Sequence, residues 1–221
     1  MTDTTTTAAT STEQAPRTAL RLLDTTSARL LADMAATLED LQTVLRCCEL
    51  LVTELAASEA RSDVTGIAGA DGVDGVVMEA LWTTAVLSYS RCFTATGTGT
   101  ALTVEDVVAA QPHGEVTEWH QVLLRLRDHY ADPALNPRER FTIGIAQDKV
   151  GAAEGIGITS ARQPLVDLLT VRQTGAIAFA LSTVLDGRLI EQQRAVFEEI
   201  RGRSRISLDK LPRLDAITGQ G

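Results

Sequence analysis

Cysteine and histidine are scarce in this 221-residue chain, which has three of each. Cys47 and Cys48 are neighbours that cannot both face one partner along a helix, and Cys92 leaves an odd number, so a disulfide framework is excluded. We therefore expect a cytoplasmic protein whose cysteines are small buried side chains. The cysteines and histidines show no paired metal-ligand spacing, and no complete phosphate-binding loop occurs, so we expect no metal site and no cofactor.

Aromatic residues, long apolar runs and positive charge are also in short supply. Aromatics make up 4% of a chain that is 44% hydrophobic, so we expect an aliphatic core of the kind typical of packed helices. No apolar run approaches the ~20 residues that a membrane span needs. The net charge of −9 argues against a broad interface with nucleic acid or anionic membrane.

The basic residues are unevenly distributed. All but two of the twenty are arginine, which is typical of a GC-rich bacterial or phage genome. The segment from Arg188 to Arg213 contains six arginines and one lysine but only four carboxylates, which leaves a local excess of three positive charges. Such a run is ordinarily a solvated helix face, and any contact with nucleic acid would be confined to it.

Composition predicts one domain with two tails. Residues 1–16 are Thr-rich and polar, with neither a basic start nor an apolar stretch, and predict a disordered tail rather than a signal peptide. No Pro/Gly/Ser linker divides residues 17–203, which we expect to form a single helical domain. Residues 204–221 predict a loosely ordered tail.

The first element has the clearest pattern. Apolar residues alternate spacings of four and three at Met34, Leu38, Leu41, Leu45, Cys48, Val52 and Leu55. This heptad seam predicts a long helix over about residues 17–58, with a bend near Asp24–Ser27 where a polar run weakens it. The seam requires one or more partner helices to cover it.

The rest of the chain predicts a loop, three helices, a β-hairpin and a long final helix. Thr103, with Asp106 three residues on, indicates a helix N-cap. Phe141, Ile143 and Ile145 alternate with small or polar residues, as in a half-buried strand. The expected ranges are 59–75 for the loop, 76–94, 103–110 and 116–130 for the helices, 139–160 for the hairpin and 164–201 for the final helix. The fold class is therefore mainly α, a four- to five-helix bundle with a small β-hairpin inserted before the C-terminal helix.

Rare residues concentrate on the helix expected at 116–130. Between its Trp119 and Tyr130 lie His120, Arg127, Asp128 and His129. Helical spacing turns His120 and Arg127 toward one side. In one interpretation Arg127 pairs with an acidic residue on the first or second helix, and His120 is a satisfied interface histidine. The alternatives are a ligand- or nucleotide-facing site and phosphodiester cleavage.

Two stretches carry a family resemblance. The first, Leu126 to Asn136, keeps Arg127, Asp128 and Asn136 of the motif Leu-Arg-Asp-Lys-His-Val-Ala-His-Ser-x-Asn. The second, upstream, consists of Leu81, Trp82, Tyr89, Arg91 and Phe93. Over roughly residues 30–160 the chain resembles the HEPN-like helical bundles, in particular uncharacterised actinobacterial proteins that end their fourth helix in that motif. Tyr130 and Pro133 stand where these proteins have histidines.

The resemblance implies a homodimeric helical bundle and, by association, a phage- or defence-related role. Active members of the superfamily cleave RNA with an arginine that a histidine follows after four to six residues, from two facing protomers. The histidine handles the proton of a ribose hydroxyl, and the arginine neutralises charge on the phosphate. Arg127 has no histidine at that spacing, and Arg125 reaches His129 with only three residues between them.

We therefore interpret the chain as a non-catalytic cytoplasmic module for dimerisation or for binding a protein partner. The alternative is a HEPN-type ribonuclease or a nucleotide-acting enzyme centred on Arg127 with His120 or His129. The residues expected at a binding interface are Trp82, Arg91, Trp119, Arg127, Asp128, Tyr130 and Asn136.

Overall fold

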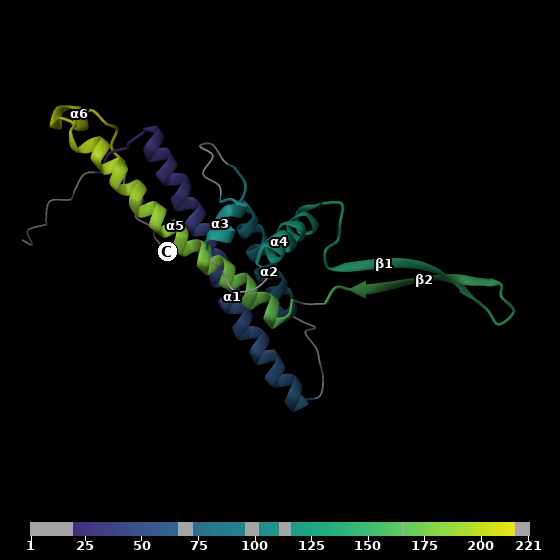
Figure 1. Cartoon of the computed structure of the whole chain (residues 1–221). Coiled ribbons are helices and arrows are strands. Elements are labelled where there is room, and N and C mark those ends of the chain that lie inside the picture. The colour runs from purple at the N-terminus through teal and green to yellow at the C-terminus, as the bar shows by residue number, and fades with distance from the viewer. Residues whose placement is uncertain (1–19, 66–72, 96–101, 111–115, 165, 215–221) are drawn as a thin grey trace, which may run out of the picture.

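The protein is a bundle of helices from which a β-hairpin projects (Figure 1). The computed structural model describes residues 20–65, 73–95, 102–110, 116–164 and 166–214. The elements are α1 (Thr26–Thr65), α2 (Val73–Arg91), α3 (Val104–Ala109), α4 (Val116–Ala131), β1 (Glu139–Gln147), β2 (Ala153–Arg162), α5 (Leu168–Arg201) and α6 (Arg205–Asp209). This order confirms a mainly α chain with a small β-hairpin before the long C-terminal helix.

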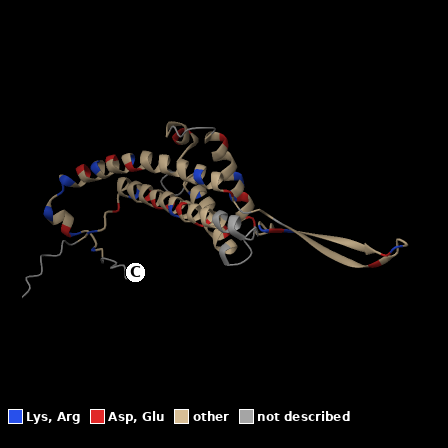
Figure 2. Ribbon diagram, turned by 90° about the horizontal axis from the view of Figure 1, so that it is seen from below, with Lys and Arg blue, Asp and Glu red and all other residues tan. Residues whose placement is uncertain are grey.

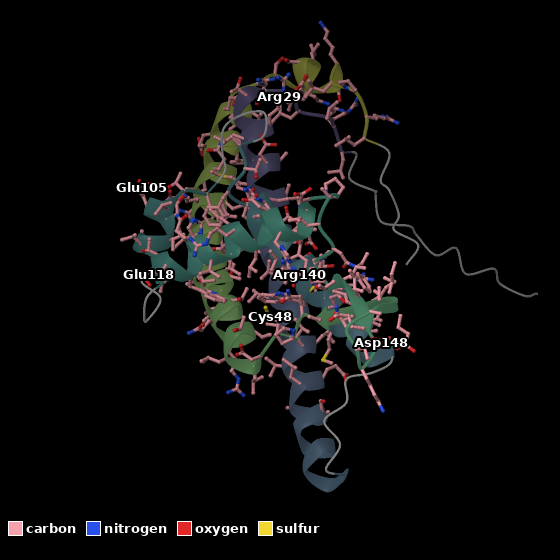
Figure 3. The ribbon with its side chains drawn as sticks, turned by 90° about the vertical axis from the view of Figure 1, so that its right-hand side faces the viewer. Arg29, Cys48, Glu105, Glu118, Arg140 and Asp148 are labelled. Atoms are coloured by element: carbon pink, nitrogen blue, oxygen red, sulfur yellow. The ribbon has the colours of Figure 1, made fainter. Side chains whose placement is uncertain are left out.

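The long helices α1 and α5 lie side by side in opposite directions (Figure 1). Near one end Gln192 Nε2 donates a hydrogen bond to the carbonyl of Ser27 at 3.0 Å. Further along, a Cβ at Gly175 would lie 3.5 Å from the Cβ of Cys48, so the two backbones approach closely there. Cys48 lies midway along α1 in Figure 3.

The buried face of α1 is wider than its heptad seam. Within the seam Leu41 and Cys48 are fully buried, whereas other seam residues are only partly buried. Val44 and Leu51, outside the seam, are fully buried as well. The reason is that α5 and α2 both pack on α1 and cover adjacent stripes of it.

Helices α2, α3 and α4 form a second layer on the α1–α5 pair. The expected N-cap of α3 is confirmed, because Thr103 and Asp106 form a capping box in which Asp106 Oδ2 accepts from the backbone N–H of Thr103 at 2.9 Å. Asp106 also pairs with Arg188 of α5. Asp106 therefore both caps α3 and anchors it to the long pair.

The hairpin of β1 and β2 is regular and exposed. Ile143 pairs with Ile158 and Ile145 with Ile156, so these four side chains project from one face. Gly151, with φ of 88°, supplies the left-handed residue of the turn. The expectation of a half-buried strand is wrong, since β1 is exposed on both faces and, within the part of the chain that the structure describes, the strands lie chiefly against each other.

The two ends of the described chain are paired. Leu22 N–H donates to the carbonyl of Pro212 at 2.8 Å, and Leu214 N–H donates to that of Leu20 at 3.1 Å. Arg21 donates to the carbonyl of Leu211 at 2.9 Å. Residues 204–214, which belong to the tail expected to be loosely ordered, contain α6 and make these contacts with residues 20–22.

Several helix boundaries differ from expectation, including both ends of α2, which spans Val73–Arg91 rather than 76–94. Helix α1 begins at Thr26 rather than at residue 17, because residues 20–22 are occupied in pairing with the C-terminal segment. It continues to Thr65, through residues assigned to a loop, because no Gly or Pro interrupts the chain before Gly66. Helix α5 begins at Leu168, where the Asp167 carboxylate caps the N–H of Thr170, and not at Pro164.

Some expectations fall wholly or partly outside the described residues: the disordered tail at residues 1–16, part of the loop expected at 59–75 and the end of the tail expected at 204–221. By length and composition alone, α5 could cross a membrane, with a mean hydropathy of 1.4 over an 18-residue window. This is weak evidence, because helices from the core of soluble proteins meet the same criterion. In this chain one face of α5 contributes Val171, Ile177 and Leu181 to the core with α1.

Candidate functional site

His120 lies in the core between α2 and α4. Its side chain is 1% exposed, and its Nδ1 shares a hydrogen bond of 2.9 Å with the Tyr89 hydroxyl. The ring of Phe93 packs edge-on against it, with centroids 4.4 Å apart. Burial lowers the pKa of His120, which favours the neutral ring. The structure therefore places His120 as a buried, hydrogen-bonded histidine between α2 and α4.

Arg127 does not hold the bundle together as predicted. Its Nε and Nη2 both donate to Oδ1 of the adjacent Asp128, at 2.8 and 2.6 Å. The side chains are 39% and 67% exposed, so the pair is solvated. The predicted partner on α1 or α2 is wrong, because the neighbouring carboxylate is within reach while Glu79 of α2 pairs with Arg138 at 2.6 Å.

His129 does not complete a catalytic pair in this chain. Its ring packs edge-on against Tyr130, with centroids 5.7 Å apart. It lies near the end of α4, whereas His120 is buried two turns and more upstream. Arg127, His120 and His129 thus occupy an exposed ion pair, the core and an aromatic contact, and the structure does not bring them together as one site.

A polar cluster at the base of the hairpin contains residues that sequence reasoning missed. The pair Glu79–Arg138 joins α2 to the segment that leads into β1. Beside it Tyr130 is partly buried, and burial followed by the negative charge of Glu79 raises its pKa, while a hydrogen bond with Trp82 opposes the rise. Asn136 Oδ1 accepts from the backbone N–H of Arg138 at 3.0 Å, so Asn136 shapes the turn.

The other expected interface residues make contacts within the chain. Arg91 of α2 pairs with Asp40 of α1. Trp119 Nε1 donates to the hydroxyl of Thr174 on α5 at 3.2 Å. These polar contacts fix how α2 and α4 sit on the long pair.

The arginine-rich region near the C-terminus is largely paired. Arg201 and Arg203 pair with Glu198 and Glu199 one turn earlier on α5. Arg188 pairs with Asp106, as described above. Glu198 and Glu199 already belong to the four carboxylates of this region, so Asp106 alone lowers the local excess of positive charge, from three to two.

Among the residues that the structure describes, no group of three or more His, Cys, Asp or Glu side chains lies close enough together to hold a metal ion.

The three cysteines are buried. Cys47, Cys48 and Cys92 form no disulfide, and burial raises the pKa of Cys48 and Cys92 to about 12. Such thiols are protonated and unreactive at neutral pH.

A continuous exposed apolar surface lies on the hairpin. Ile143, Ile145, Ile156 and Ile158 are 70–78% exposed, and Phe141 on the same face is 58% exposed. We call these five side chains the hairpin face. The opposite face carries small or polar residues, among them Thr142 and Thr159. Charged residues lie at the base and tip of the hairpin, and its middle is uncharged (Figure 2). Arg140 and Asp148, labelled in Figure 3, mark these two ends.

A second exposed apolar set follows the outer side of α5. Phe179, Ile190 and Phe197 are 65%, 42% and 58% exposed. A shallow hollow of about 280 Å³ opens beside two of them and is lined by Ile190, Gln193, Arg194, Phe197 and Glu198. Exposed charges interrupt this stripe, unlike the hairpin face.

Comparison with protein-family models, with curated proteins and with solved structures finds no match.

Proposed function

We propose that the chain is a non-catalytic, cytoplasmic helical module that binds a protein partner or a second copy of itself. The single observation that carries this proposal is the hairpin face, a projecting row of five large apolar side chains. A surface of this size and continuity on a folded protein is typical of an interaction site. Three free, buried cysteines agree with a reducing compartment.

The positions of the candidate catalytic residues support a non-catalytic role. A general base must come within hydrogen-bond reach of its proton, and His120 is 1% exposed and already bonded to Tyr89. The Arg127 guanidinium is engaged by Asp128, which weakens it as a phosphate-binding group. We therefore favour the binding module over a HEPN-type ribonuclease or nucleotide-acting enzyme.

The test is a direct assay for catalysis. The purified full chain is incubated with single-stranded RNA, structured RNA and nucleoside triphosphates, beside an Arg127→Ala variant. We expect no turnover by either protein. Cleavage that disappears in Arg127→Ala, at an unchanged melting temperature, would establish the enzyme and refute the proposed function.

A further inference from the structure

We propose that the hairpin face is a homodimer contact, in which the hairpins of two copies of this chain pack face to face. This inference rests on the proposed function and specifies its partner and its surface. The resulting contact would be a two-layer sandwich of four strands, with Phe141, Ile143, Ile145, Ile156 and Ile158 of each copy in its interior.

The first argument is that the hairpin needs a cover. An isolated two-stranded hairpin is marginally stable in water, and stability ordinarily requires a third strand or a helix against its apolar face. Within the described residues, the two strands lie chiefly against each other, and the face is open to solvent. A ladder that keeps one register from the Glu139–Arg162 pair to the Ala146–Gly155 pair, and that presents five large apolar side chains, is therefore a surface suited to being covered.

The second argument identifies an uncharged partner. No side chain of the hairpin face carries a charge, so a partner that brought charges would leave them desolvated and unpaired. The α5 stripe is unsuitable for this reason, because Asp186, Arg194 and Glu198 lie on or beside it. A second hairpin face satisfies the requirement without any additional assumption.

The third argument is the area. Five large side chains that are 58–78% exposed present on the order of 500 Å² of apolar surface. Two such faces together bury on the order of 1,000 Å², which is about the lower limit for a specific interface between proteins.

Symmetry is the fourth argument. A two-fold interface brings the same patch of each copy together, and the cross-strand pairs Ile143–Ile158 and Ile145–Ile156 form a compact centre around which a two-fold axis fits. The hairpin projects away from the bundle, so a second hairpin can reach it along most of its length (Figure 1).

The experiment measures the mass of the full chain in solution by sedimentation over a range of concentrations. We expect a concentration-dependent dimer. Ile143→Glu should raise its dissociation constant by at least about a hundredfold, because each dimer would bury two unpaired carboxylates. Thr142→Glu is the matched control, since it adds the same charge one residue away on the opposite face, and it should leave the dissociation constant nearly unchanged.

A second variant guards against loss of the hairpin itself. Ile143→Thr keeps a β-branched side chain that favours a strand, and it should still weaken the dimer by about tenfold or more. The circular dichroism and melting temperature of the bundle show whether each variant is folded.

The possible outcomes are separable. A wild-type chain that stays monomeric, or a dimer that Ile143→Glu and Thr142→Glu affect equally, would overturn the hairpin contact. Neither result bears on catalysis, which the RNA and nucleotide assay decides separately. A dimer that survives Ile143→Glu would keep the binding module and move its contact to another surface.

Discussion

At the scale of single residues, His120 links the stability of the fold to pH. Burial lowers its pKa, so the folded protein holds the ring neutral, whereas the unfolded chain protonates it below a pKa of about 6.5. As the pH falls through that value, His120 binds a proton in the unfolded chain but stays neutral in the folded protein. Stability is therefore fully present above about pH 6.5 and decreases as the pH falls toward the folded-state pKa.

The resulting prediction compares wild type with His120→Asn, which retains a hydrogen-bonding group for Tyr89 but does not titrate. Urea unfolding at about pH 7.5 and pH 5.5 should show a clear loss of stability for wild type and a smaller loss for the variant. The range stops above the region in which carboxylates with lowered pKa, such as Asp106, begin to protonate. Equal losses in the two proteins would show that His120 is not the group responsible.

Arg127 gives a second prediction at this scale. Because its partner is the exposed, adjacent Asp128, the substitution Arg127→Ala should change the free energy of unfolding by less than about 0.5 kcal/mol. Chemical denaturation provides the measurement. A loss of several kcal/mol would mean that Arg127 holds a buried contact after all, as the sequence alone had predicted.

The sequence predicted the role of a residue correctly where that role depends only on neighbours along the chain. It failed where a side chain could bond to any of several distant partners. The capping role of Thr103 and Asp106 follows from a spacing of three residues. The burial of His120 agrees with its interpretation as an interface residue, but nothing in the sequence identifies Tyr89 as its partner. For Arg127 several carboxylates were within possible reach, and only the three-dimensional arrangement shows which one it binds.

At the scale of elements, the α1 core should respond sharply to the loss of side-chain volume. Leu41 is fully buried between α1 and its partner helices, and Leu41→Ala should cost about 2–5 kcal/mol in unfolding free energy. Leu50, on the same helix but 53% exposed, is the matched control, and Leu50→Ala should cost well under half as much. Thermal and urea unfolding distinguish the two, and similar costs would contradict the assigned buried face.

The hairpin is expected to be separable from the bundle. Gln163 N–H donates to the carbonyl of Arg138 at 2.8 Å, so the two ends of the hairpin are already close together. Replacing residues 139–162 with a short Gly/Ser linker should leave the bundle folded, with a melting temperature close to that of the full chain. Loss of the helical circular dichroism would instead show that the bundle depends on the hairpin.

Periodicity predicted which elements form but not what covers them. The seam of α1 and the alternation of β1 both indicate two faces of different character. For α1 the apolar face is buried, as expected. For β1 the same argument predicted half burial, and it failed because alternation reports the character of a face and not whether a neighbour exists. On α5 Leu169 is 65% exposed, because the α1–α5 contact follows the neighbouring stripe of Val171, Ile177 and Leu181.

At the scale of the whole molecule, the C-terminal segment fastens the bundle at the end away from the hairpin (Figure 1). Ending the chain after Arg203 removes α6 and the backbone pairing with residues 20–22, and should cost about 1–2 kcal/mol, the net value of a few hydrogen bonds. A chain that ends at Leu214 keeps these contacts and serves as the control. Equal stability of the two truncated chains would show that the pairing contributes nothing measurable.

The same pairing brings the two ends of the described chain together, so the fold should tolerate a different order of its elements along the chain. Leu20 and Leu214 are joined by a backbone hydrogen bond of 3.1 Å, so a short peptide could connect them covalently, and new ends could be opened in the turn between Asp148 and Gly151. Such a circular permutant would start with β2 and finish with β1, and its hairpin would have no covalent turn. Permutation is ordinarily tolerated where the original ends are close and the new ones lie in an exposed turn. The permuted chain would thus show whether β1 and β2 stay paired when no turn links them and only the bundle holds the two strands together.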